Sequence, residues 1–192
     1  MKDEFTVGID STGEGLHKRG YRQSTTKAPI SETLASALIM LTPWKKDRIL
    51  VDPFCGSGTF AIEAAMMAAN MAPGMNRSFL SENWKNLIPK KTWYDAMDEA
   101  NDLVDLSVKT DIQGYDIDPS AVRMARENAQ RAGVDHMIHL QQRPVSALSH
   151  PGSMAYYHES AYGERLEEKA DLPELYRTIG DRFAKLDTCL CI

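Results

Sequence analysis

Cysteine is scarce in this sequence, which has only Cys55, Cys189 and Cys191 among its 192 residues. An odd count, with two of the three separated by a single residue, argues against a disulfide framework and favours reduced thiols in the cytoplasm. The pair Cys189 and Cys191 has no second pair of ligands nearby, so the sequence predicts no metal site.

Long apolar runs and an excess of positive charge are also missing. No apolar run approaches the roughly 18 residues that a membrane span needs, and the first four residues, MKDE, do not resemble a secretory signal. The formal net charge of -5 argues against a domain whose whole surface binds a nucleic-acid backbone. With 43% hydrophobic and 26% charged residues, the chain is expected to form one globular domain without a membrane partner.

One stretch near the N-terminus is nevertheless basic. It contains His17, Lys18, Arg19, Arg22 and Lys27, with Tyr21 among them. Two interpretations carry equal weight: an arm that contacts RNA through Lys18, Arg19 and Arg22, or a solvated loop face.

Strand and helix patterns alternate along the rest of the chain. After a short strand at 5–9, we expect strands at 48–54, 112–116 and 137–141, and helices from Ser31 to Pro43 and at 59–69, 92–107, 119–132 and 172–186. Residues 154–158 occupy the place of a further strand, although MAYYH is a poor buried strand, and 188–192 begin another. This order predicts an α/β fold: a Rossmann-like, doubly wound, mostly parallel sheet that is incomplete at its C-terminal end.

The glycine turn after the first buried strand is the most informative motif. Gly56, Gly58 and Ala61 match the dinucleotide pattern G-x-G-x-x-G/A, which is weak by itself. Asp52 ends the preceding strand, where it would repel a pyrophosphate. In a dinucleotide-binding fold the carboxylate that binds the ribose follows about 20 residues after the turn, whereas here the next strand-end carboxylate, Asp116, lies 58 positions after Gly58. Both features argue against a dinucleotide.

The same residues suit S-adenosylmethionine, which has no phosphate but carries an ammonium and a sulfonium. A strand-end carboxylate attracts these charges, and backbone N–H groups at a helix start can bind the ligand's carboxylate. Asp116 is placed to accept the ribose hydroxyls and Ile117 to lie against adenine. The expected cofactor residues are Asp52, Pro53, Phe54, Gly56, Ser57, Gly58, Thr59, Asp116 and Ile117, with Cys55 only a small turn residue. In the alternative interpretation, Asp52 and Asp116 merely cap helices.

Several stretches in this order closely resemble bacterial THUMP-associated RNA methyltransferases, the 23S rRNA guanine-N2 methyltransferases and their relatives. They are 15–22 (GLHKRGYR) with 28–35 (APISETLA), 51–60 (VDPFCGSGTF), 72–79 (APGMNRSF) with Trp84, and 114–119 (GYDIDP). The resemblance implies a class I fold, S-adenosylmethionine as cofactor and methyl transfer to an exocyclic base amine of ribosomal RNA. It also implies that a THUMP domain is absent, residues 1–27 form an arm or linker, and residues 28–192 form a methyltransferase domain cut near its fifth strand.

The family's catalytic motif, Asn-Pro-Pro-Tyr followed by Gly-Glu-Arg, is only partly present. Its Asn accepts hydrogens from the poorly nucleophilic amine and its aromatic residue stacks on the flipped base. Tyr162 and the residues GER after it match, whereas Glu159, Ser160 and Ala161 replace Asn-Pro-Pro. Tyr162 and Glu159 are therefore the catalytic candidates. A compensated frameshift or sequence error over 152–161 and true divergence to a non-catalytic protein both account for the break.

A second departure is Ala147, since residues 142–148 offer no carboxylate to the adenine amino group.

Three functions remain: a methyltransferase acting on guanine N2 of 23S rRNA, a DNA amino-methyltransferase, and a cofactor-binding module without turnover.

Overall fold

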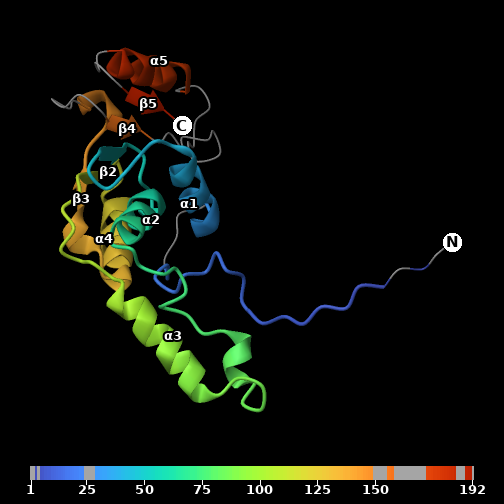
Figure 1. The fold of residues 1–192 in the computed structure, drawn as a ribbon. Coiled ribbons are helices and arrows are strands. Elements are labelled where there is room, and N and C mark those ends of the chain that lie inside the picture. Colours follow the sequence, from blue (N-terminus) through green and yellow to red (C-terminus); the bar gives the residue numbers. More distant parts are fainter. Residues whose placement is uncertain are drawn as a thin grey trace.

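The computed structural model describes residue 3 and residues 5–23, 29–148, 155–157, 172–184 and 189–191. These residues form a parallel five-stranded sheet with helices packed against it (Figure 1). The predicted Rossmann-like α/β class is confirmed.

The sheet has the strand order β3-β2-β1-β4-β5. Its strands are β1 (Ile49–Asp52), β2 (Ile112–Asp116), β3 (Ile138–Gln142), β4 (Ala155–Tyr157) and β5 (Cys189–Cys191). All neighbouring pairs are parallel, and the register of β1 against β2 places Asp52 beside Gly114. The order reverses direction after β1, so the switch point, where such sheets bind ligands, lies at the carboxyl end of β1.

Three helices support this edge of the sheet. Helix α2 (Thr59–Ala68) packs against β1, β2 and β3, with α1 (Glu32–Leu41) and α4 (Pro119–Ala132) against it. Nearly all of α2 is buried, because its alanines let the helix lie close to its neighbours. Residues at their ends cap two of these helices: Ser31 accepts a hydrogen bond from the N–H of Leu34, and Gly133 ends α4 with φ 76°.

The remaining elements lie at the periphery of the described structure. They are the short 3₁₀ helices η1 (Leu80–Asn83), η2 (Asp135–Met137) and η3 (Val145–Ala147), and the helices α3 (Lys90–Asp102) and α5 (Leu172–Phe183). Helix α3 projects away from the sheet in Figure 1 and contains no buried residue. It begins earlier than the predicted 92–107, directly after Pro89, because the charged residues at its start still favour helix. It also ends earlier and is shorter than predicted, because the chain turns at Leu103.

One prediction near the start of the chain needs correction. No strand forms at residues 5–9, where Phe5, Val7 and Ile9 are 88%, 92% and 80% exposed; their weak alternation has no neighbouring strand with which to pair. In contrast, β4 (Ala155–Tyr157) does form at the place expected for a further strand, although its sequence is a poor one for a buried strand, and β1 and β5 flank it on both sides. Pairing on two edges outweighs the weak local preference of its residues.

The segment before α1 is fixed to the loop before η1 by backbone contacts. The carbonyls of Ser11 and Thr12 accept hydrogen bonds from the N–H groups of Ser81 and Leu80, at 3.0 and 3.2 Å. The Arg77 guanidinium donates to the same Thr12 carbonyl and to three further carbonyls of this segment, those of Glu14, Gly15 and Lys18. We call residues 10–22 the arm; its part from Ser11 to Lys18 is attached through its backbone.

Candidate cofactor and substrate site

Asp52 and Asp116 end neighbouring strands at the carboxyl edge of the sheet. Asp52 is 1% exposed and its Oδ1 accepts the N–H of Phe54 at 3.1 Å. Asp116 is half-buried: its Oδ2 accepts the N–H of Gly56 at 2.9 Å and its Oδ1 that of Asp118 at 2.9 Å. The structure thus brings the two predicted carboxylates to the same turn, and Asp118, not Asp116, caps α4.

The turn between β1 and α2 is held on several sides. The N–H of Cys55 donates to the carbonyl of Tyr115 at 2.8 Å, and the Asn128 side chain, completely buried on α4, donates to the carbonyl of Ser57 at 3.0 Å. Gly56 and Gly58 have φ angles of 51° and 84°, in the left-handed region that glycine adopts without strain. A rigid, mostly buried backbone loop results.

Gly58 has a second reason to be glycine. A Cβ built on it would lie 3.0 Å from the Cβ of Ala125 on α4, so the missing side chain lets α2 and α4 approach. Because Gly58 is also the N-cap of α2, it offers no side-chain acceptor to the first turn. The start of α2 thus has no capping side chain from its N-cap residue, and the N-terminus of a helix favours an anionic group, such as a carboxylate.

Cys55 lies between the two carboxylates. Burial raises the pKa of its thiol well above the ordinary value, and the negative charges of Asp52 and Asp116 raise it further. A thiol in this environment stays protonated and is a poor nucleophile. It serves as a small packing residue, as the sequence indicates.

These residues fit S-adenosylmethionine in charge and in hydrogen-bonding capacity. The two oxygens of Asp116 each accept one N–H group, and each has a further lone pair for a ribose hydroxyl. Ile117, directly after it, is 71% exposed and offers an apolar surface to an adenine ring. Asp52 supplies negative charge at the switch point.

The basic stretch has a different place from the one expected of an RNA-contacting arm. Arg19 is buried, donates to the carbonyl of Leu16 and lies 3.6 Å from a carboxylate oxygen of Glu63 on α2. Arg22 lies 3.4 Å from Glu32 on α1 and donates to Thr59 Oγ1 at 2.8 Å. Both arginines are paired inside the protein, and Lys18 is the exposed one of the three candidates. RNA contact by these residues stays a prediction.

The partners of this stretch could not be predicted from the sequence. Tyr21, 1% exposed, donates to Glu63 at 2.9 Å, and Ser36 donates to the other oxygen of Glu63 at 2.5 Å. Glu32 and Glu63 sit on helices predicted correctly, but their acidic side chains look like ordinary surface residues. An aromatic residue between two arginines was the only hint of burial.

The catalytic candidates Glu159 and Tyr162 lie outside the described residues, so their roles stay predictions. Within the described part of the chain, no cluster of three or more possible metal ligands occurs. The same part contains no helix long and apolar enough to cross a membrane.

The strand order, the glycine turn and the two strand-end carboxylates together define a class I methyltransferase fold. Residues 19–191 match the family model described as "RMKL-like, methyltransferase domain". The chain belongs to this family.

Named relatives agree with this assignment. The chain is 44% identical over 189 residues to the "Putative RNA methyltransferase YpsC" of Bacillus subtilis, covering 98% of this chain and 49% of the relative. It is 41% identical to the "Ribosomal RNA large subunit methyltransferase K/L" of Vibrio parahaemolyticus, covering 95% of this chain and 27% of the relative. The chain thus spans half or less of the length of these relatives.

A solved structure supports the fold. The crystal structure of "SMU.472, a putative methyltransferase complexed with SAH" is 39% identical and superposes with a TM-score of 0.86. The match covers 95% of this chain and 48% of that chain.

Proposed function

We propose that this domain binds S-adenosylmethionine and transfers its methyl group to an exocyclic base amine of ribosomal RNA, with guanine N2 of 23S rRNA as the acceptor. The placement of Asp52 and Asp116 at the switch point carries the proposal, because carboxylates there suit a cationic, phosphate-free nucleoside. The names of the relatives support RNA as the substrate. The assignment to a cytoplasmic protein stays a prediction.

Each side chain of the site has a defined task in this proposal. The carboxylate of Asp52 attracts the ammonium of the amino-acid tail, and the N–H groups at the start of α2 bind its carboxylate. Asp116 accepts the ribose hydroxyls and Ile117 contacts adenine. The cofactor supplies an electrophilic methyl group, and the protein's contribution is positioning and electrostatics. Glu159 and Tyr162 are proposed to accept an amine hydrogen and to stack on the base.

Two measurements test the proposal together. Calorimetry with S-adenosylmethionine measures binding, and a tritiated-methyl assay on ribosomal RNA lacking the modification measures transfer, with a DNA duplex as the competing substrate. Binding with transfer to RNA supports the proposal, and mapping the labelled nucleotide tests guanine N2. Transfer to DNA alone would identify the amino-methyltransferase acting on adenine or cytosine.

Binding without transfer would identify a cofactor-binding module instead. This second candidate is favoured by the replacement of Asn-Pro-Pro by Glu159, Ser160 and Ala161. A folded protein that fails to bind the cofactor would overturn the whole assignment.

A further inference from the structure

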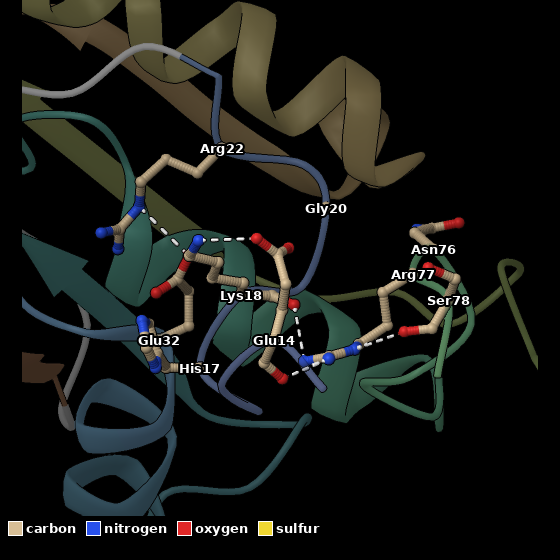
Figure 2. A pocket seen from close by; sticks show the side chains of 9 residues that line it. All are labelled: Glu14, His17, Lys18, Gly20, Arg22, Glu32, Asn76, Arg77 and Ser78. Carbon is tan, nitrogen blue, oxygen red and sulfur yellow. Dashed lines mark hydrogen bonds and ion pairs between the residues drawn. The ribbon is translucent and has the colours of Figure 1, made fainter. Parts of the chain in front are cut away.

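A polar cavity lies between the arm, the start of α1 and the loop before η1. Its volume is about 530 Å³, within the usual range of ligand-binding pockets. Figure 2 shows the nine residues that line it: Glu14, His17, Lys18, Gly20, Arg22, Glu32, Asn76, Arg77 and Ser78. Apart from Gly20, every one of them has a polar side chain, so the cavity suits a strongly polar ligand. We call it the arm pocket.

The charges of the arm pocket leave one positive charge in excess. Three of its side chains are cationic and two are carboxylates, with His17 counted as neutral. Arg22 is paired with Glu32 in a buried contact at 3.4 Å. Arg77 donates to backbone carbonyls and forms no ion pair with a carboxylate in the described part of the chain. The arm pocket therefore favours an anionic group.

Lys18 is the cation that can exchange partners. It pairs with Glu14 at 2.9 Å, but the two side chains are 56% and 71% exposed. Exposed pairs of this kind contribute little stability, so the ammonium can turn to a phosphate at small cost. The Asn76 amide and the Ser78 hydroxyl offer further hydrogen bonds, and the carboxylates of Glu14 and Glu32 can accept hydrogens from sugar hydroxyls.

The arm pocket also lies close to the cofactor turn. Arg22, which lines it, donates to Thr59 Oγ1 at 2.8 Å, and Thr59 is the first residue of α2. One arginine side chain thus separates the two sites. A ligand in the arm pocket would therefore lie near the start of α2, beside the cofactor turn.

We propose that the arm pocket binds a sugar-phosphate unit of the RNA strand next to the methylated base. The inference rests on the proposed function and adds where the strand lies. Phosphate meets Lys18 and the field of Arg77, while the 2′-hydroxyl, which distinguishes RNA from DNA, meets the polar groups of the wall. No Phe, Tyr or Trp side chain lines the pocket, and the imidazole of His17 is its one aromatic ring, so the pocket suits the backbone of the strand better than a stacked base.

The test is fluorescence anisotropy of the whole chain with a short single-stranded oligoribonucleotide and with a deoxyribonucleotide of the same sequence. Lys18→Ala is expected to weaken RNA binding about threefold to tenfold and to reduce the slope of log affinity against log salt by about 0.7. Lys91→Ala is the matched control, because Lys91 also pairs with a carboxylate four residues away, at 2.7 Å, but lies on α3 outside the pocket. It should leave RNA binding unchanged.

A second pair of variants tests sugar recognition. Asn76→Ala is expected to weaken RNA binding more than DNA binding, whereas Asn101→Ala on the exposed side of α3 should alter neither. Equal effects of Lys18→Ala and Lys91→Ala, equal affinity for the two oligonucleotides, or no binding of RNA by the unaltered chain would each overturn the proposal.

Cofactor binding of the same variants is measured by calorimetry. We expect Lys18→Ala and Asn76→Ala to bind S-adenosylmethionine as the unaltered chain does. If the unaltered chain does not bind the cofactor or does not transfer the methyl group, the proposed function is refuted. The oligonucleotide measurements test separately whether the arm pocket binds RNA.

Discussion

The Tyr21 hydroxyl donates a hydrogen bond to the Glu63 carboxylate at 2.9 Å, across 42 positions of sequence. This contact joins the arm to the middle of α2, and Ser36 of α1 donates to the same carboxylate. The arm is therefore a third partner of the two helices that support the cofactor turn. Stability of the arm and of the turn should be linked.

Tyr21→Phe tests this link. It removes one donor from a buried carboxylate while it retains the ring, so the free energy of unfolding should fall by about 1 to 3 kcal/mol. Urea unfolding followed by circular dichroism measures the change. Tyr94→Phe is the control, because Tyr94 is 63% exposed on α3. An equal, small effect of both substitutions would contradict the role assigned to Tyr21.

Glu63→Gln tests the pH dependence of the same cluster. Burial raises the pKa of Glu63 above its ordinary value of 4.5, although Ser36, Arg19 and Tyr21 lower it in part. The unfolded chain therefore loses this proton at lower pH than the folded chain, and deprotonation disfavours the folded state. As the pH rises above 4.5, the unaltered protein should lose stability relative to Glu63→Gln.

The measurement is a series of urea unfolding curves from acid to neutral pH for both proteins. The difference between them isolates Glu63 from other titrating groups. A difference that stays constant with pH, or that grows in favour of the unaltered protein, would show that the ion pair with Arg19 dominates burial.

Asp52→Asn tests the electrostatic argument for the cofactor. The substitution keeps the shape of the side chain and removes its charge, so the affinity for S-adenosylmethionine should fall by about tenfold to a hundredfold, the usual effect of losing a charged hydrogen-bond partner. Calorimetry measures it. The affinity for 5′-methylthioadenosine, which has neither ammonium nor sulfonium, should hardly change. Equal loss for both ligands would indicate a damaged turn instead of a lost charge.

Gly58→Ala tests the geometry of the turn, with Gly133→Ala as its control. Both glycines have positive φ, 84° and 76°, so each alanine costs about 1 to 2 kcal/mol of backbone strain. Only at Gly58 does the new Cβ meet a neighbour, Ala125 at 3.0 Å, whereas nothing lies within 4 Å at Gly133. Gly58→Ala should therefore destabilise more and weaken cofactor binding, which calorimetry and thermal unfolding can separate.

Most of the sheet and the cofactor turn could be predicted from the sequence, because their signals are local. Asp52 and Asp116 each end an apolar strand, and Gly58 directly precedes a helix. Parallel strands then bring both carboxylates to one edge without further information. The exact turn partners could not be foreseen, since Asn128 reaches Ser57 from 71 positions away.

The basic stretch shows why side-chain roles are harder to predict. A run of cationic residues predicts either a solvent-exposed loop or an RNA-binding segment. The neighbouring sequence does not indicate that Arg22 pairs with Glu32 and Arg19 with Glu63. Likewise, β4 forms because β1 and β5 pair with it on both sides, and this pairing cannot be predicted from the residues of β4 itself. Long-range pairing decides both cases.

The Arg77 guanidinium holds the arm by donating hydrogen bonds to the main-chain oxygens of Thr12, Glu14, Gly15 and Lys18. Every residue type presents such an oxygen, so these four contacts with Arg77 do not depend on which side chains the arm carries at those positions. Point substitutions there can retune what the arm touches without releasing it, whereas a single inserted or deleted residue would move the oxygens out of reach. The part of the arm that Arg77 holds is thus more sensitive to changes in length than to changes in composition, whereas Arg19, Tyr21 and Arg22 are also fixed by their side chains.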